Sequence, residues 1–410
     1  MTQVWRTARL ILIALCLIAA ATSELRQTIS SLLLLRHNAD KAQQASRLTP
    51  GDEAAYLQLA DLNPEFRRRY LRMAVQQNPW DAQAWMNLGF LAQIDGDLSE
   101  GRRDFRTAAE VDHRSAPAWA LANFDFQQGD VEGFDAWAAR YRQYANGNLA
   151  GLYRLAWRRQ PQVPDLIKHF NPMTCRELEE LDGFLGAHAA SVEIVPVDLL
   201  LLPCQEQEAV RLVTADISRL LMEDHPTAAV DLWNRLGQNR YFHFKRLDPR
   251  EYGLLANSDF SEQLVEAGFD WRVNRTPGVT TRRLNDSAHS LEFSFDGREP
   301  EAATLLFQPV ALSGGTTYRL EAALHSSGEQ DEAFGWRLVE LSTGRTIANG
   351  VRDTSATHKG IISWVLQAPS SSRTLALAFT YIRPTGDTRE EGKVTLSQVR
   401  LLPAGLSRTK

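Results

Sequence analysis

The sequence has little cysteine and no marked excess of either charge. Its three cysteines, Cys16, Cys175 and Cys204, are too few for a disulfide-built scaffold or a four-cysteine zinc site. The 45 basic and 50 acidic residues leave a net charge of −5, so no basic field gathers nucleic acid, and we expect no nucleic-acid partner. The composition, 44% hydrophobic and 23% charged over 410 residues, is typical of a folded chain of about two or three domains.

Signatures of catalysis are also missing. The chain has no His-Glu-x-x-His, Gly-x-x-x-x-Gly-Lys, Gly-x-Ser-x-Gly or Gly-x-Gly-x-x-Gly pattern. Two carboxylates for glycoside hydrolysis cannot be selected from 50 acidic residues by sequence alone. We therefore expect no cofactor and no metal, and we favour binding over catalysis.

One long apolar run stands at the N-terminus. Arg6 and Arg9 precede the apolar residues 10–21, the pattern of a secretory signal within residues 1–23. Residues 4–21 are also long enough for an uncleaved membrane anchor that exports the rest of the chain. Both interpretations predict a cell-envelope protein on the periplasmic side of the inner membrane, or one secreted after cleavage. The alternative is a cytosolic protein with a buried first helix.

Export would leave Cys175 and Cys204 in an oxidising compartment, where two cysteines are able to pair. Their spacing alone does not bring them together. We favour two separate buried thiols in helical packing, with a disulfide as the alternative.

A pattern with a period of 34 residues runs through the first half of the chain. Small and aromatic residues stand three apart and recur at this interval as Ala82/Trp85, Ala116/Trp119 and Ala150/Tyr153. Such pairs share one helix face. The period therefore predicts stacked helical hairpins over residues 24–237, with these aromatic residues and Trp137 in the core.

At these residues the chain resembles tetratricopeptide-repeat (TPR) proteins. Trp85, Leu88 and Gly89 stand at motif positions and a turn at Gly96 follows them, whereas the later repeats depart from the motif. The similarity extends over about residues 48–160. It implies a helical solenoid that docks a protein partner.

The hydropathy period changes to two in the last third of the chain. The alternating runs are 291–295, 318–324, 375–381 and 394–399. Runs of this kind, separated by turn residues, indicate an antiparallel β-sandwich with one face of each sheet buried. We place the sandwich at residues 257–403, after a linker at 238–256 and before a tail at 404–410.

The last third resembles jelly-roll carbohydrate-binding modules in the order of its elements. These are 257–260 at the start, Trp271, 315–320 entering a strand and 392–396 at the end. Many such modules hold a structural calcium ion through an acidic residue near the final strand, where this chain has Ser397-Gln398-Val399. The expected fold class is multidomain, α then β: a TPR-like solenoid followed by an antiparallel β-sandwich (jelly roll).

The sandwich also carries the candidate ligand residues. Sugar binding usually needs an exposed aromatic face with polar side chains beside it. The candidates are Arg319, Glu321, Trp336, Arg337 and Trp364. For each tryptophan taken alone, packing in the core is the favoured alternative, because the sequence does not show which face it occupies.

Together these features predict a non-catalytic envelope scaffold. The repeats would dock a protein partner, and the sandwich would bind polysaccharide or a second protein. The combination resembles repeat-containing accessory proteins of bacterial exopolysaccharide assembly and export. The alternatives are a glycan-active hydrolase or lyase with its site on the sandwich, and a sandwich that serves only to dock proteins.

Overall fold

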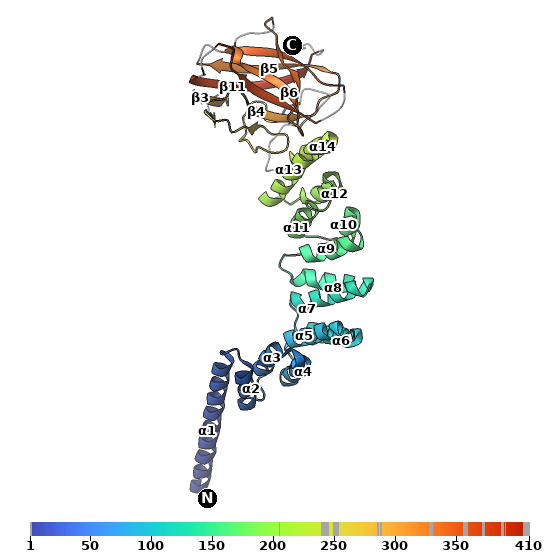
Figure 1. The fold of residues 1–410 in the computed structure, drawn as a ribbon, viewed down its shortest axis with the longest axis vertical. Coiled ribbons are helices and arrows are strands. Elements are labelled where there is room, and N and C mark those ends of the chain that lie inside the picture. The colour runs from blue at the N-terminus through green and yellow to red at the C-terminus, as the bar shows by residue number, and fades with distance from the viewer. Residues whose placement is uncertain are drawn as a thin grey trace. The chain divides into compact units, whose positions relative to one another are not determined.

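The computed structural model describes residues 2–204, 206–238, 246–248, 254–284, 287, 289–327, 331–355, 360–370, 374–386, 389 and 391–404. Most of the predicted linker and tail, and the side chain of Arg6, lie outside the described residues. Within them, fourteen α-helices precede two antiparallel sheets, which confirms the predicted fold class (Figure 1). Contacts divide the chain into two compact units, residues 1–155 and 156–410.

The first unit is built from helices. They are α1 Thr2–Leu34, α2 Ala39–Leu48, α3 Glu53–Leu62, α4 Arg67–Gln77, α5 Ala82–Ile94, α6 Leu98–Val111, α7 Ser115–Gln127, α8 Val131–Tyr144 and α9 Ala150–Arg159, in which the division between the units falls. The pairs α5–α6 and α7–α8 are the predicted hairpins. Each turns at a glycine with positive φ, Gly96 or Gly129, and the next helix starts at a capping aspartate, Asp97 or Asp130.

The hairpin α5–α6 is packed through small residues. A Cβ on Gly89 would lie 2.7 Å from the ring of Phe105, and one on Gly101 would lie 3.2 Å from the backbone oxygen of Gly89. Phe105 is fully buried and makes an edge contact with Phe124 of the next hairpin. Glycines thus let the two helices approach closely, while one phenylalanine fills the space between successive hairpins.

The repeated aromatic residues share a place near the start of their helices, but not the same burial. Tyr153 is fully buried, as predicted. Trp85 and Trp119 are half-buried: Trp85 packs against core residues on both of its sides, and Trp119 lies against Gly151 of α9. Trp137 is also half-buried. These three tryptophans therefore line the seams between helices, and the prediction that they fill the core holds only in part.

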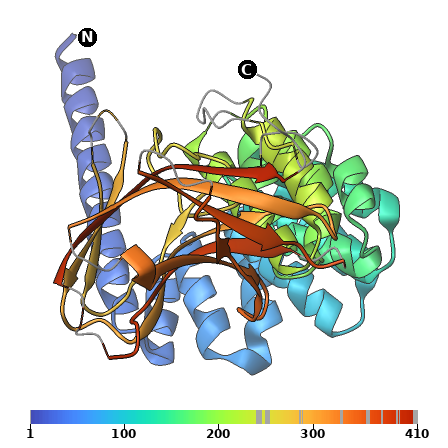
Figure 2. The ribbon, with the colours of Figure 1, turned by 90° about the horizontal axis from the view of Figure 1, so that it is seen from above.

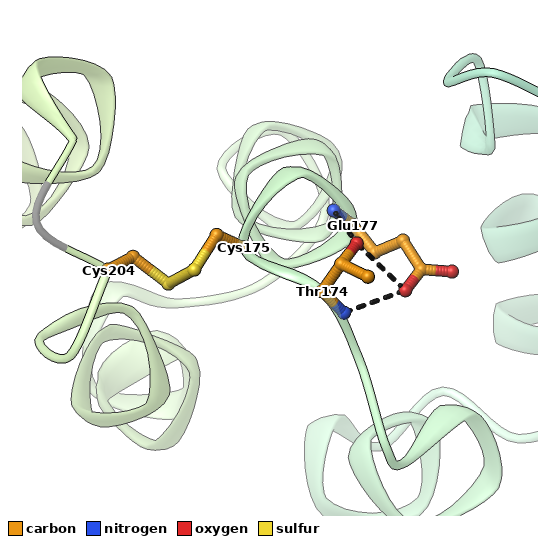
Figure 3. The surroundings of a disulfide bond; sticks show 4 residues. All are labelled: Thr174, Cys175, Glu177 and Cys204. Atoms are coloured by element: carbon orange, nitrogen blue, oxygen red, sulfur yellow. Dashed lines mark hydrogen bonds between the residues drawn. A yellow bond between two sulfur atoms is a disulfide. The ribbon is translucent and has the colours of Figure 1, made fainter.

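The second unit begins with α10 Val163–Phe170, α11 Cys175–Leu185, α12 Ser191–Leu201, α13 Gln207–Met222 and α14 Pro226–Leu236. A disulfide joins Cys175, at the first residue of α11, to Cys204, just after α12 (Figure 3). The favoured interpretation of two separate thiols was therefore wrong. The hairpin turn between α11 and α12 brings together residues that sequence spacing keeps 29 apart. A capping box of Thr174 and Glu177 starts α11 beside the disulfide.

The sandwich consists of two antiparallel sheets whose layers can be followed in Figure 2. The strands are β1 Arg272–Val273, β2 Val279–Arg283, β3 Leu291–Asp296, β4 Ala302–Val310, β5 Thr317–Ser326, β6 Phe334–Glu340, β7 Thr346–Asn349, β8 Val351–Arg352, β9 Ile361–Gln367, β10 Leu375–Ile382 and β11 Glu391–Pro403. One sheet has the order β1-β4-β10-β6-β7 and the other β2-β3-β11-β5-β9-β8. The four runs predicted from alternation are β3, β5, β10 and β11.

Strand β10 differs from the expectation that one face of each sheet is exposed, because it is buried along both faces. Its outward residues are small, and Ala378 lies between Phe307 of β4 and Arg337 of β6. Long side chains on both flanking strands leave such a short side chain little exposure.

The last helices are fixed to the sandwich by polar and aromatic contacts. The hydroxyl of Ser218 on α13 accepts the Gly268 N–H at 2.8 Å. Asp224 accepts both the N–H and the hydroxyl of Thr374, just before β10, at 2.6 and 3.0 Å. A Cβ on Gly268, whose φ is +56°, would lie 2.6 Å from the Trp233 ring of α14. Helices α13 and α14 and the sandwich therefore form one packed body.

Candidate functional site

The five predicted ligand residues fall on two different parts of the sandwich. Arg319 and Glu321 lie on β5 and point away from the core, opposite the buried Tyr318 and Leu320, as the alternation predicts. Arg319 is exposed and Glu321 is half-buried. They belong to the six-stranded sheet, and neither lines the hollow beside Trp336 and Trp364.

The same outer face carries an ion cluster closer to its edge. Glu292 of β3 lies 3.2 Å from the Lys393 Nζ and 3.1 Å from the Arg282 Nη2. The Lys393 ammonium, with Arg282 beside it, holds the pKa of Glu292 below its usual range. Glu292 is thus fully paired, and the cluster of one carboxylate and two cations keeps a net charge of +1.

Both candidate tryptophans lie in the core between the sheets. Trp336 of β6 is 1% exposed and Trp364 of β9 is 2% exposed, and their rings meet edge to face at 6.3 Å. Trp336 also contacts Trp271 and Phe379. Neither ring presents an open face, so neither is available to stack against a sugar. This is the alternative that the sequence favoured for each of them.

A hollow of about 450 Å³ lies beside these tryptophans, where the chain passes from one sheet to the other. Its lining combines Arg337 of β6, Asn349 of β7, Arg352 of β8 and Thr380 of β10, with the two tryptophans beneath. Three of the five predicted residues, Trp336, Arg337 and Trp364, are therefore brought together here.

Gly350 makes the passage between the sheets possible. Its N–H donates to the Trp336 carbonyl oxygen at 2.8 Å, and a Cβ there would lie 3.0 Å from that oxygen. A larger residue at this position would require the backbone here or at Trp336 to shift by a few tenths of an ångström. The glycine thus keeps Arg352 near Arg337 although the two strands belong to different sheets.

The hollow is polar and carries an excess of positive charge. Arg337 and Arg352 are half-buried, and neither has a carboxylate at ion-pair distance among the described residues. Glu332, at the exposed rim, is the only carboxylate in the described lining. Guanidinium groups bind carboxylates in a bidentate manner, and the amide of Asn349 and hydroxyl of Thr380 offer further hydrogen bonds. The arrangement fits an anionic, hydroxyl-rich ligand.

Two of the residues that the sequence analysis missed, Asn349 and Arg352, lie on very short strands, whereas Thr380 lies on the predicted strand β10. Asn349 ends a four-residue strand and Arg352 ends a two-residue strand. A four-residue strand is at the lower limit at which period-two alternation is recognised, and a two-residue strand is below it. The only sequence signal near Arg352 is Gly350, the glycine at which the chain crosses from one sheet to the other.

A second hollow, of about 300 Å³, lies in the first unit where α6, α7 and α8 meet. The Arg140 guanidinium lies 4.7 Å from the centre of the Trp137 ring, and Tyr144 beside it is 42% exposed. Asp112 and Arg114 form an ion pair at the opposite wall. Half-exposed aromatic and arginine side chains of this kind are frequent in protein-binding surfaces.

No protein-family model matches the sequence, and no curated protein matches it. Among solved structures, the chain is similar to yeast Tom70, with 13% identity and a TM-score of 0.31 over 54% of this chain and 52% of Tom70. It is similar to YrrB, described as "a TPR protein with an unusual peptide-binding site", with 10% identity and a TM-score of 0.25 over 50% of this chain and 95% of YrrB.

A structure described as CBM4 matches with 11% identity and a TM-score of 0.26 over 36% of this chain and 97% of that one. Similarities of this size carry no argument about function. We therefore base the assignment of TPR-like hairpins and a β-sandwich on the elements and contacts described above.

Proposed function

We propose that the protein is an exported, non-catalytic adaptor whose sandwich binds an acidic polysaccharide in the hollow beside Arg337 and Arg352. The observation that carries the proposal is the pair of half-buried arginines without a carboxylate partner among the described residues. Uronic-acid carboxylates would pair with them, and sugar hydroxyls would bond to Asn349 and Thr380. Recognition would depend on charge and hydrogen bonds, since the two tryptophans are buried.

Export is supported by the N-terminal helix and by the disulfide. Residues 12–34 of α1 form a segment long and apolar enough to cross a membrane; residues 12–29 are exposed, whereas Ser30 is fully buried. Helix α1 is unbroken from the start of this segment to Leu34. Near its end, the Ser30 hydroxyl accepts a hydrogen bond from the Thr49 hydroxyl at 2.7 Å. We propose an uncleaved anchor, with the rest of the chain in an oxidising compartment that permits the disulfide.

The helical repeats would hold a protein partner of the polysaccharide system. The hollow of Trp137, Arg140 and Tyr144 supports this role, because amphipathic aromatic and arginine side chains often dominate binding energy. A complex for exopolysaccharide assembly or export would use both proposed activities, protein binding by the repeats and polysaccharide binding by the sandwich.

The test uses the full-length chain in detergent, titrated with a uronic-acid polymer and a neutral glucan. We expect binding of the acidic polymer, weakened at least about tenfold by Arg337→Gln with Arg352→Gln, because two charge-assisted contacts are lost. Arg319→Gln, on the outer face of the other sheet, is the matched control and should bind as the wild type does. A folded wild type that binds neither polymer would remove the sugar half of the proposal.

A glycan-active enzyme is the second candidate and has less support. Glycoside hydrolysis uses two carboxyl groups about 5 to 10 Å apart, whereas the described lining of the hollow offers Glu332 alone. Turnover of the acidic polymer that Glu332→Gln abolishes would establish the enzyme and overturn the adaptor.

A further inference from the structure

Three aspartates from three consecutive helices meet inside the second unit. Asp182 lies on α11, Asp198 on α12 and Asp216 on α13, and the side-chain oxygens they offer all lie within 4.8 Å of one another. Their exposed fractions are 3%, 0% and 4%. Carboxylates so deeply buried are rare unless something compensates their charge.

The described residues compensate only part of this charge. The Arg219 Nη1 donates to Asp216 at 3.0 Å. Asp198 is fully buried and faces the other two carboxyl groups, and neither of its oxygens has a hydrogen-bond partner among the described residues. The Oδ1 atom of Asp182 also has no such partner. If all three carboxyl groups are ionised, one guanidinium leaves two negative charges, which is the charge that a single divalent cation neutralises.

The surroundings hold the three carboxyl groups in place. The Cys175–Cys204 disulfide joins the start of α11 to the end of α12, and Glu223, at the end of α13, accepts the Ser191 N–H and hydroxyl at the start of α12. A binding site on rigid, cross-linked helices is pre-organised, which lowers the entropic cost of binding.

Burial raises the pKa of Asp182 to about 8 and that of Asp198 to about 9, with the neighbouring carboxylates adding to the shift. Burial raises the pKa of Asp216 as well. The alternative to a bound cation is therefore that the three carboxyl groups are protonated and share these protons among themselves.

We propose that Asp182, Asp198 and Asp216 bind one hard divalent cation, of the Ca²⁺ or Mg²⁺ class, which ties α11, α12 and α13 together. Carboxylate oxygens without nitrogen or sulfur donors select this class. Asp216 stands two residues before Ser218, which bonds to the sandwich at Gly268. The cation would thereby stabilise the helices on which the sandwich is seated, whatever the sandwich itself binds.

The experiment uses full-length protein in detergent, freed of metal with EDTA and titrated by calorimetry with Ca²⁺, Mg²⁺ and Mn²⁺ separately. We expect one cation bound per chain for at least one of the three, with a rise in melting temperature. Asp198→Asn should weaken binding at least about tenfold, since one charged ligand is lost. Asp231→Asn, at an exposed position of α14, is the matched control and should bind as the wild type does.

Two results would overturn the proposal. One is a wild type that binds none of the three cations with a Kd below about 1 mM, the weak limit for extracellular calcium sites. The other is a folded Asp198→Asn variant that binds with unchanged affinity and stoichiometry. Should Asp198→Asn fail to fold, Asp182→Asn replaces it, and the wild-type titration decides alone if both fail.

Discussion

In the hairpins α5–α6 and α7–α8 the helices approach through glycine and alanine, whereas helices α11, α12 and α13 enclose three carboxyl groups and are cross-linked by a disulfide. The hairpins also bury two aspartates, Asp104 and Asp125, and the Arg102 Nη2 lies 2.9 Å from Asp125. Repetition stabilises the first region through shape, since each hairpin buries the face of the next, and ion pairs such as Arg68–Glu100 and Arg102–Asp130 add to it. The second region also buries apolar side chains, such as Leu181, Ile194 and Ile217, but adds a disulfide between α11 and α12 and the Ser191–Glu223 hydrogen bonds between α12 and α13.

The largest effect should come from breaking the shape of the first region. Phe105→Ala removes a fully buried ring between two hairpins, so we expect a loss of about 3–5 kcal/mol in the free energy of unfolding. Phe66→Ala, at a 52% exposed ring, is the control and should cost less than about 1 kcal/mol. Chemical denaturation measures both. Equal costs would show that burial of the ring is not what stabilises the hairpins.

Removal of the disulfide should affect the second region alone. The bond closes a loop over a sequence separation of 29 residues, for which chain entropy predicts about 3–4 kcal/mol. We expect Cys175→Ala with Cys204→Ala to raise hydrogen exchange in α11 and α12 and to leave α5–α8 unchanged. Faster exchange in the hairpins would mean that the two regions are not independent.

The two regions also differ in how far their sequence predicts them. The 34-residue period reveals the hairpins because a small and an aromatic residue recur on one helix face, and alternation reveals the long strands β3, β5, β10 and β11. Alternation did not reveal strand β4, because Leu305 is an extra residue in its pairing with β10 and interrupts its period of two.

The sites were harder to predict than the elements. Arg337 was selected because it follows Trp336, but Arg352 joins it through a crossing between sheets that no local pattern encodes. Asp182, Asp198 and Asp216 resemble solvent-facing acids in sequence, and only the packing of three helices brings them together. The pairing of Cys175 with Cys204 depends on the same packing.

A smaller loss of stability should follow from removing Arg102, the ion-pair partner of the buried Asp125 in the hairpins. Arg102 forms ion pairs at 2.9 Å with both Asp125 and Asp130, donates a hydrogen bond to Asp130, and is 32% exposed. Arg102→Ala should cost about 2 kcal/mol, below the 3–5 kcal/mol of a fully buried pair, because water reaches the site. Adding Asp125→Asn should recover part of the loss, since no buried charge then remains unpaired. An unchanged stability of Arg102→Ala would show that the pair is neutral in energy.

The smallest effect is the pH dependence of the same site. Burial raises the pKa of Asp125, and Asp130 adds to this, whereas Arg102 and Arg106 lower it. A carboxyl whose pKa is higher in the folded state binds more protons there, so its contribution to stability is complete below the unfolded pKa of about 3.9 and is lost as the pH rises through the folded pKa. In hydrogen exchange of α7 and α8 over this range, Asp125→Asn should flatten the decline, and the exposed control Asp61→Asn should not. An identical decline in Asp125→Asn and wild type would mean that Asp125 keeps its ordinary pKa, and that Arg102 compensates its burial completely.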